Sequence, residues 1–348
     1  MNTLGVSAIP PATTRADAPL IAALEAARLH PLWDRYKSIT PIAPRSTDEP
    51  LLWKWRDFVA LADRAAREVA IEDVERRAII MANPAYGGRT VTTANLIAAF
   101  TILEPGDHAV PHRHTAAAIR FATAAEGAVT IVNGRRCEMK DGDLVLTPPM
   151  CWHGHINEST HRTYWFDAAN MPLIMDLDAS FFEPGPRHET GFWKVDEGDE
   201  RLFENPGMAP LNRLASPQSP QYRYPGEATR RMLAAVAPTA DGVRTVRYVN
   251  PSTGGAVMST LDCYATRLAR GAASRAQRTT FNTVCLVCSG EGRSTIGNQR
   301  FEWGRHDVFT IPHWTWATHE ALSANADLLL VTDRCVFEAL DLLRIEHE

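Results

Sequence analysis

Two segments decide the fold: PGDHAVPHRH at residues 105–114 and GDLVLTPPMCWHGHIN at residues 142–157. Each segment carries a His-x-His pair beside a turn and a β-rich run. Side chains alternate between the two faces of an extended strand, so both histidines of a pair point the same way. Four imidazoles could therefore converge on one cavity, enough for a divalent metal with open coordination positions. The pairs are His112 with His114 and His153 with His155.

Short β-rich runs with tight turns surround these pairs. Asn133-Gly134, between two such runs, is a strong type I′ hairpin signal. Because no helical pattern separates the runs, the region favours an antiparallel barrel or sandwich. Strands are expected at 78–84, 90–103, 118–121, 128–132, 135–139 and 144–147, and again from 256 to 332. Helices are expected at 17–29, with Asp17 as its cap, at 55–69 and at 227–237.

Composition fits a globular protein with one large or two ordinary domains. The 348 residues are 45% hydrophobic and 22% charged, and the net charge is −5. The arginines are scattered, and no apolar run approaches the roughly 20 residues that span a bilayer. Residues 1–15 lack a signal-peptide pattern and are expected to be a frayed tail. We therefore expect no nucleic-acid or membrane partner and a cytoplasmic location.

Cysteine usage agrees with a reducing compartment. Six cysteines are too few for a disulfide scaffold in a chain of 348 residues. Cys285 and Cys288 have the spacing of a redox or zinc pair, but they lie in an apolar strand-like run. Because no second cysteine or histidine pair stands nearby, we predict buried strand thiols.

The second β-rich region repeats the first. The Asp-x4-Pro pattern at residues 143–148 returns at residues 307–312, and Glu126-Gly127 returns as Glu291-Gly292. In the second copy, the positions of His112, His114 and His153 hold Gln277, Thr279 and Ala317, whereas His155 keeps a counterpart in His319. A soft divalent metal would not select the second set. The repeat therefore predicts two small β-barrels, one metal site with three ligands, and a fourth histidine that faces substrate.

These motifs resemble those of the cupins. Gly106-x5-His112-x-His114 resembles the first cupin motif, and Gly142-x5-Pro148-x4-His153 resembles the second. The usual motif-one glutamate is absent, as in bicupin gentisate 1,2-dioxygenases and their salicylate and 1-hydroxy-2-naphthoate relatives. The resemblance to this family covers residues 76–343, and it includes Ile119-Arg120-Phe121 and Trp165-Phe166-Asp167. It implies an all-β core with helical additions, built as two antiparallel jelly-roll barrels.

The resemblance also implies an activity. Such an enzyme uses Fe(II), one per chain, to insert both atoms of O₂ into an aromatic hydroxy acid. The ring opens, in an extradiol-type cleavage, between the carbons that bear the carboxylate and the hydroxyl. The family's roles carry over to seven residues: the iron ligands His112, His114 and His153, the carboxylate-binding Arg120, a second active-site arginine at Arg76, an active-site histidine at His155 and an acidic residue at Asp167. We expect His155 to contact substrate oxygens and to act as an acid or base, and Asp167 to support a histidine or arginine of the site. Thr101 departs from the family's glutamine but is also expected to contact substrate.

Arg120 raises a geometric question. It follows His114 by six residues, and a straight strand would place it about 20 Å away at roughly 3.3 Å per residue. The chain must therefore bend if the Arg120 guanidinium, which matches a carboxylate bidentately, is to reach a metal-bound substrate.

The substrate and two other functions stay open at this point. Thr101 stands where gentisate-cleaving members usually carry glutamine, and Gly154 where they often carry aspartate. A 5-substituted salicylate, such as a nitro or halogen derivative, is thus an alternative to gentisate. The sequence also allows a non-redox isomerase or hydrolase with Zn or Mn, and a cupin that only binds aromatic acids.

The sequence predicts four parts and self-association. Residues 1–75 form a helical segment, 76–186 the metal-binding cupin, 187–255 a connection and 256–348 a cupin without metal ligands. The family resemblance implies a homo-oligomer, either a tetramer or a dimer.

Overall fold

The computed structural model describes residues 17–186 and 216–348, so the expected tail and much of the expected connection lie outside the described residues. The chain divides into two units, residues 1–45 and 46–348. The first holds α1 (Ala18–Ala26) and α2 (Leu32–Ile39). The expected cap was wrong, because the Asp17 carboxylate does not cap α1 and instead accepts a hydrogen bond from the Trp33 indole (3.1 Å).

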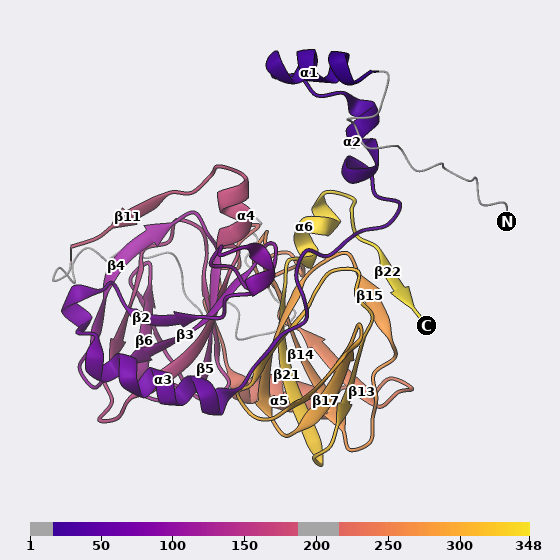
Figure 1. Cartoon of the computed structure of the whole chain (residues 1–348). Coiled ribbons are helices and arrows are strands. Elements are labelled where there is room, and N and C mark those ends of the chain that lie inside the picture. The colour runs from indigo at the N-terminus through magenta and orange to yellow at the C-terminus, as the bar shows by residue number, and fades with distance from the viewer. Residues whose placement is uncertain (1–16, 187–215) are drawn as a thin grey trace. The chain divides into compact units, whose positions relative to one another are not determined.

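The second unit holds two jelly-roll barrels, each made of a six-stranded and a five-stranded sheet (Figure 1). The first barrel's larger sheet has the order β12-β8-β5-β10-β3-β2, with bounds Arg223–Tyr224, Leu144–Thr147, Ala118–Ala124, Thr163–Ala169, Ile97–Leu103 and Arg77–Ile80. Its smaller sheet has the order β11-β4-β9-β6-β7, with bounds Phe182–Pro184, His108–His114, His153–Asn157, Ala128–Val132 and Arg135–Glu138.

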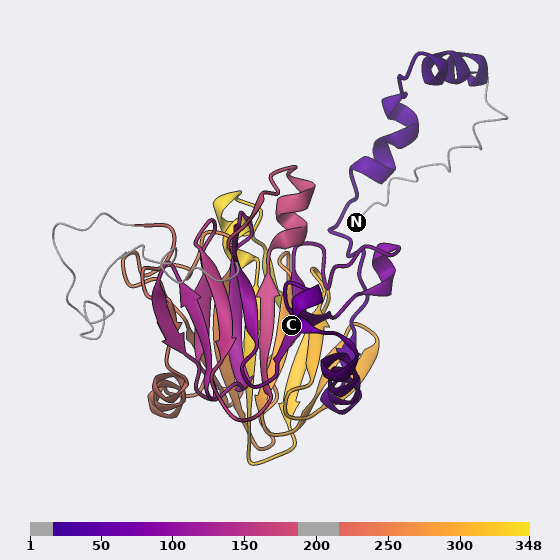
Figure 2. The same ribbon diagram turned by 90° about the vertical axis from the view of Figure 1, so that its left-hand side faces the viewer.

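The second barrel repeats this plan (Figure 2). Its larger sheet has the order β1-β19-β16-β21-β14-β13, with bounds Leu52–Trp53, Val308–Ile311, Thr283–Ser289, Asn325–Thr332, Asp262–Ala269 and Val243–Arg247. Its smaller sheet has the order β18-β17-β20-β15-β22, with bounds Gln299–Trp303, Gly292–Ile296, Ala317–Ala321, Gln277–Thr279 and Ile345–His347. The predicted all-β architecture with helical additions is confirmed.

Helices and turns complete this unit. The expected helices occur as α3 (Trp55–Glu68) and α5 (Gly226–Ala235), and Asn133 and Gly134 have the positive φ angles of a type I′ turn. The other helical elements in the described part of this unit are α4 (Met171–Asp176), α6 (Arg334–Ala339), and the 3₁₀ turns η2 (Ile71–Asp73) and η3 (Pro84–Tyr86). Among the described residues, no helix has both the length and the apolar character needed to cross a membrane.

The strand registers confirm the internal repeat. His112 pairs with His153 in the first barrel, and Gln277 pairs with Ala317 in the second. Thr130 pairs with His155 in the same way that Ser294 pairs with His319. The sequence alignment of the two halves is therefore also their alignment in space.

A shared hydrophobic core joins the two barrels. Phe100, Ile119 and Phe166 from the first barrel belong to one buried cluster with Leu286 and Leu329 from the second. The large sheets thus bury their apolar faces together, which removes that surface from water.

One stretch of chain links both barrels. β1 pairs with β19 of the second barrel, and α3 then contacts β2 and β3 of the first. Between them, Lys54 forms an ion pair with Asp307 (2.8 Å). The Trp55 ring contacts Phe100 and Tyr164 on one side and His306 on the other, with centroids 5.0, 5.5 and 5.1 Å away.

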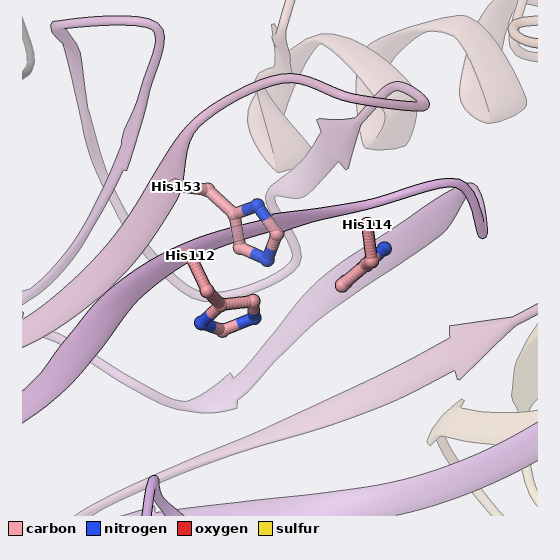
Figure 3. Close-up of side chains that lie close together, drawn as sticks. All are labelled: His112, His114 and His153. Atoms are coloured by element: carbon pink, nitrogen blue, oxygen red, sulfur yellow. The ribbon is translucent and has the colours of Figure 1, made fainter. Parts of the chain in front are cut away.

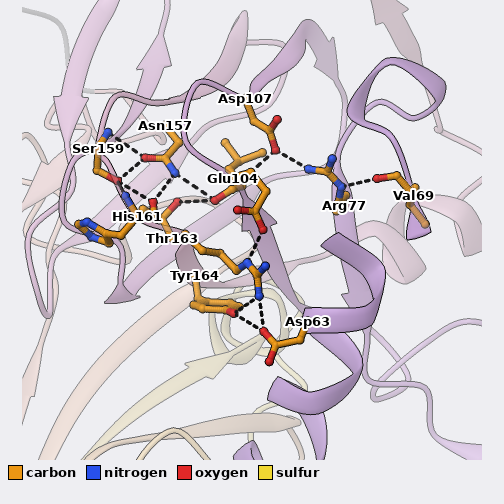
Figure 4. A network of polar contacts seen from close by, with 12 residues as sticks. Asp63, Val69, Arg77, Glu104, Asp107, Asn157, Ser159, His161, Thr163 and Tyr164 are labelled. Carbon is orange, nitrogen blue, oxygen red and sulfur yellow. Dashed lines mark hydrogen bonds and ion pairs between the residues drawn. The ribbon is translucent and has the colours of Figure 1, made fainter. Parts of the chain in front are cut away.

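Ion pairs tie α3 to one end of the first barrel (Figure 4). Arg162 forms ion pairs with Asp63 of α3 and with Glu104 at the end of β3. Arg77, at the start of β2, is buried and forms an ion pair with Asp107 in the turn between β3 and β4. These contacts hold the turn at residues 104–107, which leads into β4, the strand that carries two of the candidate metal ligands.

We expect Arg77→Met to destabilise the protein by about 3 kcal/mol, because removal of one partner leaves the other charge of a buried pair uncompensated. The variant also loses the hydrogen bond from Arg77 Nε to the Val69 carbonyl (2.6 Å). Urea denaturation would measure the change in the free energy of unfolding. Arg64→Met is the matched control, since Arg64 and Glu68 form a surface pair, and it should leave stability unchanged. Equal effects in both variants would contradict this interpretation.

Candidate active site

Three of the four histidines gather inside the first barrel (Figure 3). His112 and His114 come from β4 and His153 from the paired β9, and one nitrogen from each lies within 4.8 Å of the others. Their ring centroids are 4.2 to 5.4 Å apart. A register shift between Ala109 and His112 marks a β-bulge, the kind of irregularity that re-aims side chains next to active sites.

Hydrogen bonds orient each ring of this cluster. Nδ1 of His112, His114 and His153 lies 2.9, 2.7 and 2.9 Å from the carbonyl oxygens of Val110, Ala116 and Cys151. A carbonyl oxygen only accepts hydrogen bonds, so each Nδ1 carries the proton and each Nε2 keeps its lone pair. This arrangement is how proteins usually orient metal-binding histidines.

The cluster is electrically suited to a cation. Burial lowers the pKa of His112 to about 3 and that of His114 to about 4, and burial also holds the pKa of His153 well below its usual value. All three rings are therefore neutral at neutral pH. The Nε2 atom of His153 is buried and has no hydrogen-bond partner among the described residues. A metal ion would satisfy this atom, so the residues present fit a metal site.

His155 lies apart from the cluster. Its ring centroid is 6.1 Å from that of His153 and 5.1 Å from that of Trp165. Nδ1 lies 3.0 Å from the Thr130 hydroxyl, and Nε2 accepts a hydrogen bond from Arg120 Nε (3.2 Å). Both ring nitrogens are thus engaged, and burial holds the pKa of His155 well below its usual value.

Arg120 lies on β5 and is only 1% exposed. The expected bend is present, because the chain bends at residues 115–116 as it passes from β4 in the smaller sheet to β5 in the larger one. Besides His155, Arg120 contacts the Thr147 hydroxyl and Asp167, whose Oδ1 is 3.5 Å from Nε. Burial lowers the pKa of Arg120 to about 10, which leaves it a cation at neutral pH.

Asp167 and Thr101 form the wall behind Arg120. The Thr101 hydroxyl donates to one oxygen of the Asp167 carboxylate, and the Trp165 indole donates to the other (3.1 Å). Thr101 is fully buried, so its place is beside the carboxylate that faces Arg120. A direct contact between Thr101 and substrate stays a prediction.

Arg76 lies just before β2, close enough to the cluster to lower the pKa of His112. Its Nη1 is buried without a hydrogen-bond partner among the described residues and lies 3.6 Å from the Glu75 carboxylate. An unsatisfied guanidinium N–H beside the metal-binding cluster is available for an anionic ligand.

Four residues of the site were missed in the sequence: Thr130 and Thr147, whose hydroxyls bond to His155 and Arg120, and Glu75 and Phe182. The Glu75 carboxylate lies 3.0 Å from His112 Nδ1, and the Phe182 ring stacks on the His112 ring with centroids 5.2 Å apart. Glu75 lies outside every motif, and only its position next to Arg76 could have drawn attention to it. Phe182 belongs to β11, a strand that pairs with β4 through a stretch without clear periodicity.

The second barrel lacks this chemistry. Gln277, Thr279 and Ala317 occupy the equivalent positions, and the three histidines of the first barrel are the one His/Cys/Asp/Glu group with metal-binding geometry within residues 17–186 and 216–348. The six cysteines form no disulfide. Cys285 is buried as expected, whereas Cys288 is only partly buried. Burial raises the pKa of both thiols and keeps them protonated.

Comparisons with known proteins agree with this geometry. Residues 99–168 match the cupin domain family. The chain is 34% identical to a gentisate 1,2-dioxygenase of a Streptomyces species, over 93% of this chain and 94% of the relative. It is also 34% identical to a 5-aminosalicylate 1,2-dioxygenase of a Comamonas species, over 91% and 87% of the two chains.

A solved structure extends this likeness to three dimensions. Salicylate 1,2-dioxygenase from Pseudoaminobacter salicylatoxidans, in an adduct with gentisate, superposes with a TM-score of 0.91 at 32% identity. The alignment covers 98% of this chain and 96% of the other. Since sequence and structure agree over nearly the whole length, the chain belongs to the bicupin gentisate and salicylate 1,2-dioxygenase family of ring-cleaving dioxygenases.

Proposed function

We propose that this chain binds one Fe(II) ion through the Nε2 atoms of His112, His114 and His153. With O₂ it would then open the ring of an aromatic acid between the carboxylate-bearing and hydroxyl-bearing carbons, an extradiol-type cleavage. One observation carries the proposal: three neutral imidazoles face one another beside a buried arginine cation. Three imidazoles suit several first-row metals, and the ring-cleaving relatives favour iron among them.

The residues around the cluster bind and orient the substrate. Fe(II) held there would supply a path for electrons from the electron-rich ring to O₂. Arg120 binds the carboxylate of the substrate, since its buried charge strengthens the interaction in a site of low dielectric. Asp167 and Thr147 hold the guanidinium plane, and Arg76 offers a second cationic N–H.

His155 orients Arg120 in this proposal. The neutral ring accepts a hydrogen bond from Arg120 Nε, and its Nδ1–H is directed at Thr130. With both nitrogens engaged, the ring positions the guanidinium group and is poorly placed to transfer a proton. Proton transfer through His155 would require one of these hydrogen bonds to break first.

The substrate proposed is a salicylate with a polar or halogen group at position 5, which includes gentisate and 5-nitrosalicylate. The chain has relatives named for gentisate and for 5-aminosalicylate. Thr101 is shorter than glutamine and donates its hydroxyl to Asp167. This wall therefore presents less hydrogen-bonding capacity to the ring than a glutamine would.

The test is an oxygen-electrode screen of protein loaded anaerobically with Fe(II). Gentisate, salicylate, 5-nitrosalicylate, 5-halosalicylates and 1-hydroxy-2-naphthoate are the acids to compare. We expect stoichiometric O₂ uptake with at least one acid, and loss of uptake after chelation of the metal. If Zn- or Mn-loaded protein transformed an acid without O₂ uptake, the protein would instead be a non-redox cupin enzyme. Tight binding without turnover would indicate an aromatic-acid-binding protein.

Glu75→Gln should weaken Fe(II) binding by about 10- to 100-fold, the usual effect of losing a partner of a metal-binding histidine. The Glu75 carboxylate lies 3.0 Å from His112 Nδ1 and makes that imidazole a stronger base. Metal competition with a chelator would measure the change. Glu183→Gln is the control, because Glu183 is paired with Arg113 instead of a ligand. Unchanged iron affinity in Glu75→Gln would show that Glu75 does not support the metal site.

We also propose the division expected from the sequence, with a helical segment at 1–75, cupins at 76–186 and 256–348, and a connection at 187–255. The short strands β1, β12 and β13 join the sheets from outside the two cupin ranges. A cytoplasmic location is proposed because the cysteines form no disulfide. Self-association into a dimer or tetramer is proposed from the family, and sedimentation equilibrium would measure it.

A further inference from the structure

A cavity lies between the two barrels, and none of the three histidines lines it. Its volume is about 460 Å³, within the roughly 300–1,000 Å³ range of small-molecule sites. Its walls come from β5 of the first barrel, from β14 and β21 of the second, and from α5. α5 contacts β13 and β14 of the second barrel, and Arg230 of α5 donates a hydrogen bond to the Asp141 carbonyl of the first (3.1 Å).

The walls combine apolar surface with one unsatisfied hydroxyl. Phe121, Leu233 and Leu329 supply apolar surface. Tyr248 also lines the cavity, and its buried hydroxyl makes no well-formed hydrogen bond among the described residues. The Thr229 hydroxyl lies close to it, but the proton of that hydroxyl is directed at the Pro225 carbonyl oxygen (3.4 Å). A buried hydroxyl without a partner costs free energy, which a ligand or water in the cavity would recover.

Positive charge is in excess among the charged groups that line the cavity. Arg230 and Arg305 share one carboxylate, that of Asp141, at 3.6 and 3.4 Å. All three side chains are about half exposed, so these long ion pairs are weak. Asp327 adds no free negative charge, because Arg267 holds both of its oxygens at 2.7 Å. One anion could therefore bind here and complete the charge balance.

We infer that this cavity binds a small apolar monocarboxylate, such as an aromatic acid. Its carboxylate lies between Arg230 and Arg305, and its body fills the space beside Phe121 and Leu329. A second anionic group would have no cationic partner, which disfavours dicarboxylates and phosphates. The inference does not rest on the reaction proposed for the histidine site, since the two sites share no residue.

The test is equilibrium dialysis of the iron-loaded protein against 2-naphthoate. We expect the wild type to bind one equivalent more than the Arg230→Ala/Arg305→Ala variant, or to bind that equivalent roughly 10- to 100-fold more tightly. Thr229→Phe, which fills the cavity from α5, should remove the same equivalent. Arg231→Ala is the matched control, because Arg231 is the next residue of α5 and pairs with Glu227 outside the cavity.

The outcomes separate this site from the histidine site. If the protein cleaved none of the acids in the oxygen-electrode screen, the extra equivalent would still be lost in the Arg230→Ala/Arg305→Ala variant. Equal binding by the wild type, this variant and Thr229→Phe, all folded by circular dichroism, would overturn the inference. The cavity would then be a solvent-filled gap between the barrels.

Discussion

Replacement of His153 by alanine is expected to abolish iron binding and to reduce turnover by more than about a thousandfold, which corresponds to roughly 4 kcal/mol at 1.4 kcal/mol per decade. His153 is fully buried, and its Nε2 has no partner among the described residues. Two histidines from one strand would remain, too few to hold the ion in competition with water. Iron content and O₂ uptake measured on the same sample would show both losses.

Two comparisons make this result specific. His108→Ala changes an exposed histidine at the start of the same strand, β4, and should leave iron and turnover intact. Metal-free His153→Ala should unfold at a lower temperature than the metal-free wild type, because the variant loses a fully buried ring and its Nδ1 hydrogen bond to the Cys151 carbonyl. Circular dichroism therefore has to show that the variant is folded when its iron content is measured. Full iron content in His153→Ala would exclude the three-histidine site.

Arg120→Lys should raise the Michaelis constant by roughly 10- to 100-fold while iron content stays unchanged. The ammonium group keeps the positive charge but loses the planar fork, whose charged hydrogen bonds contribute about 1.5–3 kcal/mol. The substitution also removes the contacts that Arg120 makes with His155 and Thr147. Steady-state kinetics with the preferred acid would measure the change.

Arg113→Lys is the matched control for this variant. Arg113 lies between two of the candidate ligands on β4, but its side chain pairs with Glu183 and stacks over Trp152. An unchanged Michaelis constant in Arg120→Lys would refute the carboxylate assignment. Loss of iron in Arg120→Lys would show that the arginine supports the metal site instead of the substrate.

Much of the architecture was predictable because it depends on local signals. The Asn133-Gly134 turn, the limits of α3 and the spacing of the two histidine pairs follow from residues close together in the sequence. The internal repeat added a long-range comparison, and it separated His155 from the three other histidines. In the structure His155 lies outside the group of three and bonds to Thr130 and Arg120.

The sequence failed to predict two features: the start of β3, which depends on hydrogen bonds between side chains and the backbone, and the position of Glu75, which depends on a contact between residues distant in sequence. The strand expected at 90–103 begins only at Ile97, because the hydroxyls of Thr92 and Thr93 hydrogen-bond to the backbone and hold a loop. The position of Glu75 beside His112 depends on how β2 lies relative to β4. No periodic pattern in the sequence reports such a contact.

The strand β1 has a consequence for synthesis of the protein on the ribosome. Lys54 and its partner Asp307 are 253 residues apart, so β1 and the nearby Trp55 emerge long before their partners exist. During translation, the first barrel can enclose its histidines, but β1 cannot pair until β19 of the second barrel has been synthesised. Such distant pairing is slow to form. Completion of the C-terminal barrel therefore fixes β1 and Trp55 in place. A prematurely terminated chain leaves β1 unpaired and the Trp55 ring partly uncovered, and this apolar surface would favour aggregation.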